Sequence, residues 1–252
     1  MSKALLQIEN LCKNYGEKTV VSEVSFHVKD GDILGFIGPN GAGKSTTINI
    51  ISTIEQPDHG RILFQGKDVK MQEKHFKKSL GIVPQDLALY EDLNAYDNVH
   101  FFCSLYNLRG EELSGSVKEA LEFVGLWDRR KDYPSKFSGG MKRRLNIACA
   151  IAHHPKMLIM DEPTVGIDPQ SRNNILDTIK ILNKRGTTVI YTSHYMEEVE
   201  ALCNRIVLLD KGIVIEDLEK DEYKNKYQAL GYETLEDMFL YLTGTDLRDM
   251  EE

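Results

Sequence analysis

The sequence predicts an α/β fold in which a block of helices interrupts a series of apolar strands. Short apolar runs such as Ile33–Ile37 and Met157–Met160 are typical of buried parallel strands. Between them, apolar residues recur at helical spacing over about residues 86–154. Strands and helices alternate again after this block, which favours an α/β core carrying an inserted helical subdomain.

The first third of the chain is rich in expected strands. Val24, Phe26 and Val28 alternate with polar residues, as in a strand buried on one face. The Asp30-Gly31 pair marks a turn before the next apolar run. The expected strands of this region lie at residues 5–8, 24–28, 33–37 and 61–64.

The helical block contains two well-marked helices. Gly125 is placed to end the second of them, because glycine readily adopts the left-handed conformation that closes helices. Turn-rich breaks are expected near residues 107–110 and 132–140. The periodic apolar residues are Val99, Phe102, Cys103 and Tyr106 in one helix, and Val117, Ala120, Leu121 and Val124 in the other.

The last third returns to alternating strands and helices. Expected strands at residues 157–160 and 188–191 flank a helix, and residues 205–215 predict a hairpin turning at 210–212. In the tail, Thr234 and Asp237 have the spacing of a capping box, so a short amphipathic helix is expected to start there and fold back on the core.

Composition limits the function classes. The 252 residues are 41% hydrophobic and 28% charged, which is a globular balance. The formal net charge of −8 argues against binding nucleic acid or anionic lipid by bulk electrostatics. No apolar stretch approaches the roughly 18 residues of a membrane span, so a cytoplasmic chain is expected. The four scattered cysteines indicate neither a zinc site nor a disulfide framework.

A phosphate-binding loop follows the apolar strand at residues 33–37. The segment fits G-x-x-x-x-G-K-[S/T], in which backbone N–H groups wrap a phosphate at the start of a helix. Lys44 is expected to reach the β- and γ-phosphates, and the Ser45 hydroxyl to ligate Mg²⁺. The expected ATP-binding residues of this loop are Gly38, Pro39, Asn40, Gly41, Ala42, Gly43, Lys44, Ser45 and Thr46.

Two carboxylates follow the strand at residues 157–160. Asp161 is expected in the Mg²⁺ shell, and Glu162 is expected to orient or deprotonate the attacking water. With the phosphate loop, this pair indicates an NTPase or a kinase. A GTPase would carry N-K-x-D, but the candidate at residues 183–186 ends in glycine, so guanine specificity is disfavoured.

The segment Phe137-Ser138-Gly139-Gly140-Met141 resembles the L-S-G-G-Q signature of ABC ATPases, with departures at its two ends. In that family Ser138, Gly139 and Gly140 would face the γ-phosphate held by a second subunit. Four further residues match the family's motifs in the right order: Tyr15 as the aromatic that stacks on adenine, Gln85 as the glutamine near Mg²⁺, Asp168 as the residue communicating across the dimer, and His194 as the switch histidine.

Each of these four residues also has a plain structural interpretation when taken singly. Gln85 could be a turn residue, Tyr15 a core residue and His194 a loop histidine. Asp168 could cap the helix that Pro169 begins. The basic run at residues 142–144 is interpreted as a solvated helix face.

The resemblance implies a P-loop NTPase (RecA-like) core with an antiparallel β subdomain and an inserted α-helical subdomain at about 86–154. The ABC ATPase domain is expected to cover residues 1–220, followed by a short helical tail at 221–252. The implied activity is ATP hydrolysis with Mg²⁺, in which Glu162, His194 and Lys44 act on the phosphate, and Ser45, Gln85 and Asp161 hold the metal.

The resemblance also implies partners and a place of action. Two such subunits would sandwich two ATP molecules head to tail and power a separate transmembrane permease at the cytoplasmic face of the cell membrane. The segment at residues 89–106 and the tail are similar to bacterial drug, sodium or lipid exporters, so export is expected. The alternative is a non-transport ABC ATPase acting on DNA or ribosomes, which the acidic charge and the compact gap between the phosphate motifs disfavour.

Overall fold

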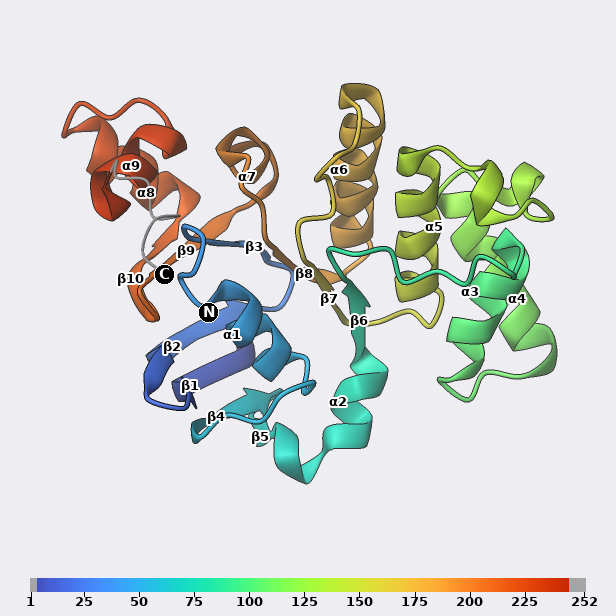
Figure 1. Ribbon diagram of the computed structural model, residues 1–252, viewed down its shortest axis with the longest axis horizontal. Coiled ribbons are helices and arrows are strands. Elements are labelled where there is room, and N and C mark those ends of the chain that lie inside the picture. The colour runs from blue at the N-terminus through green and yellow to red at the C-terminus, as the bar shows by residue number, and fades with distance from the viewer. Residues whose placement is uncertain (1–3, 245–252) are drawn as a thin grey trace. The chain divides into compact units, whose positions relative to one another are not determined.

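The computed structural model describes residues 4–244 (Figure 1). The chain divides into two compact units, and each is described by itself. The first comprises residues 1–76 together with 190–252, and the second comprises residues 77–189.

An antiparallel sheet dominates the first part of the first unit. Its strands lie in the order β2-β1-β4-β5. The register pairs Ile8 of β1 with Phe26 of β2 and with Ile62 of β4, and all three side chains are buried. The strands expected at residues 5–8, 24–28 and 61–64 are confirmed within β1 (Ala4–Tyr15), β2 (Lys18–Lys29) and β4 (His59–Phe64). The short strand β5 (Lys67–Asp68) was not predicted.

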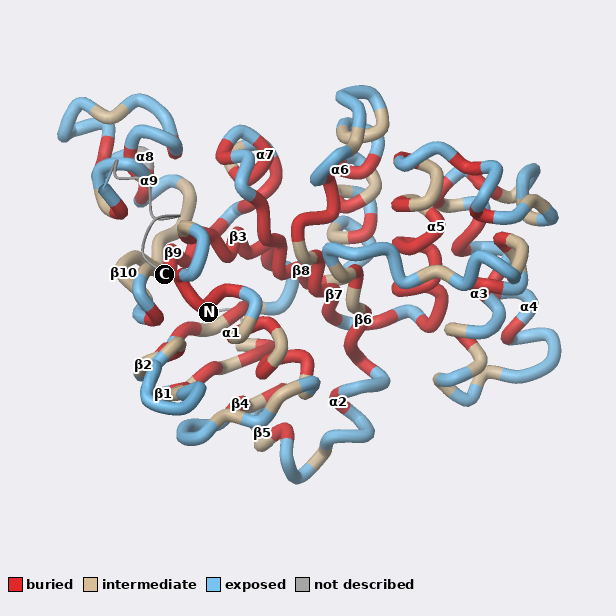
Figure 2. The backbone as a smooth tube through the Cα atoms, viewed as in Figure 1, coloured by how far each residue is buried: buried red, intermediate tan, exposed pale blue. Residues whose placement is uncertain are grey.

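A second group of strands lies in the same unit. All five residues of β3 (Ile33–Ile37) are buried, as its continuous apolar sequence predicts (Figure 2). β3 pairs in parallel with β9 (Arg205–Asp210), and β9 turns at Lys211-Gly212 into β10 (Ile213–Glu219). The predicted hairpin is therefore confirmed. The helices of the first unit are α1 (Lys44–Ile51), α7 (Met196–Leu202), α8 (Lys220–Gln228) and α9 (Leu235–Thr243), with a 3₁₀ turn at Val69–Met71.

The predicted tail helix is α9. Thr234 Oγ1 accepts from the Asp237 backbone N–H, and the Asp237 side chain accepts from the Thr234 N–H, so the capping box is confirmed. The helix ends at Gly244, whose φ of 82° favours glycine. α9 contacts α7 of the core, as expected. Residues 245–252 of the predicted tail lie outside the described residues.

Helices make up most of the second unit. Three of them, α3 (Ala95–Ser104), α4 (Gly110–Phe123) and α5 (Gly139–Ile151), pack on one another (Figure 1). The two expected helices and the breaks between them are confirmed. Asn94 caps α3 by accepting from the Asp97 N–H at 2.9 Å. Two 3₁₀ turns follow α4, at Trp127–Arg129 and Pro134–Lys136, and the second of them lies in the break expected near residues 132–140.

The strands of the second unit are β6 (Leu80–Val83) and β7 (Met157–Met160), which pair in parallel. After β7, helix α6 (Pro169–Lys184) leads to β8 (Thr188–Tyr191), through which the chain returns to the first unit. Helix α2 (Glu73–Ser79) carries the chain from the first unit to the second. Local sequence patterns predict β7, α6 and β8, whereas α2 and β6 were not predicted.

A buried histidine links stability to pH in the second unit. His153 stacks on Tyr106 with ring centroids 3.5 Å apart, and its Nε2 lies 3.0 Å from the Leu80 carbonyl oxygen. A carbonyl can only accept, so Nε2 carries the hydrogen in this contact. Burial lowers the pKa of His153 to about 4 from 6.5.

The free energy of unfolding is therefore expected to fall as the pH drops below about 6.5, because His153 then binds a proton in the unfolded chain but not in the folded chain. The expected loss between pH 7 and pH 5 is about 2 kcal/mol. Urea unfolding of the wild type and of His153→Phe at pH 7 and at pH 5 measures this loss of stability. An equal pH dependence in the two proteins would contradict this assignment.

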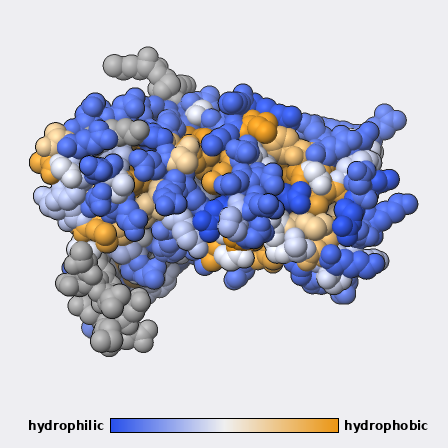
Figure 3. All heavy atoms as spheres, turned by 90° about the horizontal axis from the view of Figure 1, so that it is seen from above, coloured by the Kyte–Doolittle hydropathy of each residue, from blue (hydrophilic) through white to orange (hydrophobic). Residues whose placement is uncertain are grey.

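The face of the molecule drawn in Figure 3 is mostly hydrophilic. Within residues 4–244 no helix combines the length and apolar character needed to cross a bilayer. In Figure 3 apolar side chains form separate patches on a predominantly hydrophilic face. Scattered patches of this kind are ordinary for a globular domain.

Candidate active site

The phosphate-binding loop joins β3 to α1 in the first unit. A Cβ on Gly38 would lie 2.2 Å from the Leu209 carbonyl oxygen, and one on Gly43 would lie 2.5 Å from that of Val20. Both contacts are with backbone, so only glycine fits at either position. Gly43 also has a φ of 98°, which favours glycine. The two glycines thus let the loop lie directly on neighbouring backbone and bend sharply into the helix.

The start of α1 presents groups suited to an anion. Gly43 provides no side-chain cap, and the first turn holds no acidic residue, so neither competes with a ligand for the first backbone N–H groups. Lys44 is buried, and its Nζ donates to the carbonyls of Gly38 and Pro39 at 2.7 and 3.0 Å. The ammonium group therefore lies over the loop, next to an exposed Ser45.

Tyr15 lies beside this loop, at the end of β1. Its side chain is 49% exposed, which excludes the core interpretation. The hydroxyl donates to Glu55 Oε2 at 2.6 Å, and this hydrogen bond raises the pKa of Tyr15. Glu55 also pairs with Lys13 at 3.1 Å. The phenol is thus fixed at its hydroxyl. Lys13 Nζ lies over the ring, 5.6 Å from its centroid, and the rest of the half-exposed ring is open to solvent.

Hydrogen bonds on both sides of His194 hold the loop that carries it. Buried Glu198 of α7 accepts from the Tyr191 hydroxyl at 2.6 Å and from the Ser193 hydroxyl at 2.9 Å. Ser193 Oγ in turn accepts from the Tyr195 N–H at 3.0 Å. These bonds bracket His194, which is itself exposed just after β8.

In the second unit, the parallel pairing of β6 and β7 brings two motifs together. Val83 pairs with Met160, so the residues that follow both strands emerge at the same edge. There Gln85 Nε2 lies 3.3 Å from Glu162 Oε2. Glu162 is buried and has a φ of 46°, a strained conformation of the kind often found at functional sites. Asp161, half-buried, donates its N–H to the Val83 carbonyl at 2.9 Å.

The signature segment forms the start of α5. Ser138 caps the helix by accepting from the Met141 N–H at 3.2 Å, and both Ser138 and Gly139 are exposed. A Cβ on Gly140 would lie 2.2 Å from Ser171 Oγ, so glycine here permits close packing of α5 on α6. Asp168 caps α6 by accepting from the Ser171 N–H at 3.0 Å, as expected.

The basic run after the signature is not a solvated face, so that interpretation is wrong. Arg143 is 4% exposed and donates to the carbonyls of Pro84 and Gln85. Lys142 pairs with Glu91, and Arg144 donates to the Val124 carbonyl. The helical spacing could have predicted the burial of Arg143, because Gly140, Arg143 and Ile147 lie on one side of α5 and are all buried.

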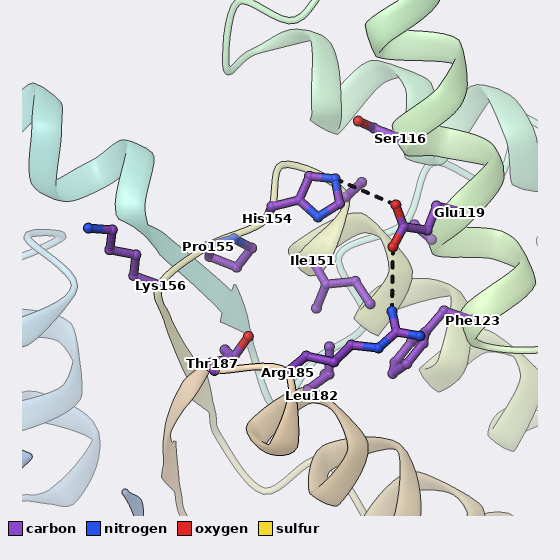
Figure 4. A pocket seen from close by; sticks show the side chains of 13 residues that line it. Ser116, Glu119, Phe123, Ile151, His154, Pro155, Lys156, Leu182, Arg185 and Thr187 are labelled. Carbon is purple, nitrogen blue, oxygen red and sulfur yellow. Dashed lines mark hydrogen bonds and ion pairs between the residues drawn. The ribbon is translucent and has the colours of Figure 1, made fainter. Parts of the chain in front are cut away.

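A cavity of about 280 Å³ in the second unit lies away from the predicted site residues (Figure 4). It opens before the amino ends of β7 and β8, whereas Asp161 and Glu162 follow the carboxyl end of β7. Glu119 lies between His154 and Arg185, at 3.9 and 3.4 Å. Arg185 also stacks over Phe123. None of the predicted site residues lines this cavity.

The predicted site residues therefore fall into two groups, one in each unit, which we call half-sites. The first lies at and around the phosphate-binding loop, and the second follows β6 and β7 and begins α5 and α6. The first half-site contains Tyr15, the loop at residues 38–46 and His194. The second contains Gln85, Ser138, Gly139, Gly140, Asp161, Glu162 and Asp168.

The sequence of this chain is similar to those of known proteins. The ABC transporter family model matches residues 21–165. The chain is 54% identical over 211 residues to the linearmycin resistance ATP-binding protein LnrL of Bacillus subtilis, covering 84% of this chain and 68% of that protein. It is 39% identical to the Nod factor export ATP-binding protein I of Paraburkholderia xenovorans, covering 84% and 70%.

A solved structure matches as well. It is a dimeric ATP-binding cassette in a post-hydrolysis state, bound to ADP and phosphate, with a TM-score of 0.76 and 26% identity over 85% of this chain and 98% of that one. The P-loop NTPase fold predicted from the sequence is thereby confirmed. The chain belongs to the ABC transporter family, in which it is an ATP-binding subunit that hydrolyses ATP.

Proposed function

We propose that this chain is the motor subunit of an exporter, and that two copies close head to tail over two ATP molecules to drive a separate transmembrane permease. The observation that carries the proposal is the pair of half-sites, one built to hold phosphates and one presenting a buried carboxylate beside an amide. The names of two relatives, which refer to linearmycin resistance and to Nod factor export, support the direction of transport.

The phosphate loop holds the nucleotide in this proposal. Backbone N–H groups at the start of α1 contact the phosphates, and Lys44 exchanges its two loop carbonyls for phosphate oxygens. The open face of Tyr15 stacks on adenine, with its hydroxyl fixed by Glu55. Each of these contacts uses a group whose position the first unit already fixes.

The donors available suit Mg²⁺. A hydroxyl from Ser45, a carboxylate from Asp161 and the amide oxygen of Gln85 are oxygen ligands of the type this ion prefers. Within residues 4–244 no three His, Cys, Asp or Glu side chains group as a metal site, which agrees with an ion held mainly through nucleotide phosphates. When bound, Mg²⁺ would neutralise charge on the β- and γ-phosphates.

Hydrolysis depends on the residues that follow β7 and β8. Glu162 orients the attacking water and accepts its proton, and Gln85, 3.3 Å away, keeps the carboxylate in place. Lys44 and His194 stabilise the charge on the transferring phosphoryl group. The hydrogen bonds of Glu198 hold the His194 loop in position for this role.

The second copy completes each site. Ser138 and Gly139 are exposed at the amino end of α5, where the helix dipole and the free N–H groups favour an anion. In the proposed dimer this helix end faces the γ-phosphate bound by the partner, and Asp168 lies near the dimer interface. The dimeric ADP-bound structure of the similar cassette supports such a pairing.

An aromatic cluster (Tyr90, Phe101 and Phe102) supplies a docking surface for the permease, which would keep the chain at the cytoplasmic face of the membrane. Tyr90 is 49% exposed and packs edge-to-face on Phe101, which is 37% exposed. Fully buried Asn98 fixes the loop, because its side chain accepts from the Tyr90 N–H and donates to the Tyr90 and Leu93 carbonyls. A rigid, exposed aromatic surface of this kind suits an apolar helix.

Replacing Leu89 and Tyr90 with alanine is expected to uncouple the permease and spare ATP binding. The double variant should lose most co-purification with the co-expressed transmembrane permease, because the docking surface loses its aromatic anchor. Tyr241→Ala is the matched control, since Tyr241 is an equally exposed tyrosine on α9. Loss of nucleotide binding in the double variant would refute the docking assignment.

A further inference from the structure

One guanidinium group connects the signature helix to the segment that carries Gln85. Arg143 lies in the second turn of α5, five residues after Ser138. Its Nη1 donates to the Pro84 carbonyl at 2.7 Å and its Nη2 to the Gln85 carbonyl at 2.6 Å. The two terminal nitrogens thus bridge consecutive peptide groups, an arrangement for which the planar fork of arginine is suited.

These two bonds continue the backbone pairing of the sheet. The last register pair of β6 and β7 is Val83 with Met160, and the Val83 carbonyl accepts from the Asp161 N–H. The next two carbonyls along the chain, those of Pro84 and Gln85, receive the guanidinium. Here one side chain supplies a donor to both carbonyls, at the point where the strand pairing stops.

The position of Arg143 is strongly constrained. Its side chain is 4% exposed, and burial lowers its pKa from the usual value. Within the described residues its Nε has no hydrogen-bond partner, so the terminal nitrogens make its contacts. A buried guanidinium is costly unless its hydrogen bonds hold, so α5 and the backbone at residues 84–85 are fixed to one another.

The contact is specific to one of three adjacent basic residues. Lys142 pairs with Glu91, and Arg144 donates to the Val124 carbonyl at the end of α4. Only Arg143 reaches the backbone of Gln85, whose side chain lies 3.3 Å from Glu162. An unbroken series of contacts therefore runs from the signature helix through Arg143 and Gln85 to Glu162.

We propose that Arg143 is a positioning residue for hydrolysis, which holds the Gln85 backbone so that the amide of Gln85 keeps Glu162 in place. The proposal rests on the roles given above to Gln85 and Glu162. Arg143 itself contacts neither nucleotide nor water. It acts on the turnover step and leaves nucleotide binding to the phosphate loop of the first unit.

Arg143→Met is expected to lower kcat about tenfold and to leave KM for ATP within about twofold, because a displaced Gln85 loosens the carboxylate but not the phosphate loop. Arg143→Lys should recover part of kcat, since one ammonium can still donate to these carbonyls. Arg144→Met removes a similar arginine–carbonyl bond from the same helix and is the matched control. Its kcat should stay within about twofold of the wild type.

A double-mutant cycle tests whether Arg143 acts through Gln85. Gln85→Ala should lower kcat by itself, and adding Arg143→Met should lower it no further, because the two changes remove one shared interaction. Adding Arg144→Met to Gln85→Ala should multiply their separate effects. Thermal unfolding of each variant identifies any that fail to fold, and Arg143→Lys then carries the comparison.

Two results would overturn the inference: effects of Arg143→Met and Gln85→Ala that multiply, or an Arg143→Met variant whose KM rises while kcat is unchanged. Failure of the proposed role of Gln85 would give a different result. If Gln85→Ala turned over ATP at the wild-type rate, the role proposed for Gln85 would be wrong, and the role of Arg143 with it.

Discussion

Replacing Glu162 with glutamine is expected to lower kcat for ATP hydrolysis at least 100-fold while ATP still binds normally. A general base contributes about 10²- to 10⁴-fold to such a rate, and an amide cannot accept the proton of the attacking water. Glutamine has nearly the same shape as glutamate, and Glu162 Oε2 accepts a hydrogen bond from the Gln85 amide, which can donate to either side chain. Steady-state phosphate release and the affinity for a fluorescent ATP analogue measure the two effects.

Glu236→Gln is the control for this change. Glu236 is exposed in the first turn of α9, so its replacement removes the same charge from a position without a proposed role. Its turnover should equal that of the wild type. Wild-type turnover in Glu162→Gln would remove Glu162 from the role given to it.

Replacing Lys44 with alanine is expected to weaken ATP binding about 10- to 100-fold. Hydrogen bonds to a charged group contribute about 1.5–3 kcal/mol each, and tenfold in affinity corresponds to about 1.4 kcal/mol. Alanine also leaves the Gly38 and Pro39 carbonyls without the donor that holds the loop. Titration of the purified chain with a fluorescent ATP analogue measures the change.

Lys67→Ala is the matched control, because Lys67 is an exposed lysine of the same unit at the start of β5. It should bind ATP as the wild type does. Since the net charge changes equally in both variants, equal losses of affinity would show that Lys44 acts only through bulk charge.

Much of this fold can be predicted from local sequence patterns. β3 and β7 match their predicted bounds because each is a continuous apolar run buried on both faces. The helix caps at Ser138, Asp168 and Thr234 follow from short-range hydrogen bonding, which a sequence shows directly. Elements of this kind depend little on distant residues.

Features set by tertiary packing could not be predicted in this way. β6 is only four residues long and follows a basic helix, so its parallel pairing with β7 has no local signal. Charge runs on helices usually face solvent, and only the folded chain shows that Arg143 lies against the backbone at residues 84–85. The hydrogen bonds by which Glu198 holds the His194 loop likewise depend on how α7 packs against the end of β8.

The two-chain ATP sandwich is tested most directly by the mass of Glu162→Gln in solution. Light scattering after gel filtration with Mg²⁺ and ATP should give twice the single-chain mass of 28.7 kDa, and the single-chain mass without nucleotide. Adding Ser138→Asp preserves an N-cap acceptor but aims a negative charge at the partner's phosphate, so the doubling should disappear. A single-chain mass at saturating ATP, with normal turnover by Ser138→Asp alone, would contradict the proposed motor.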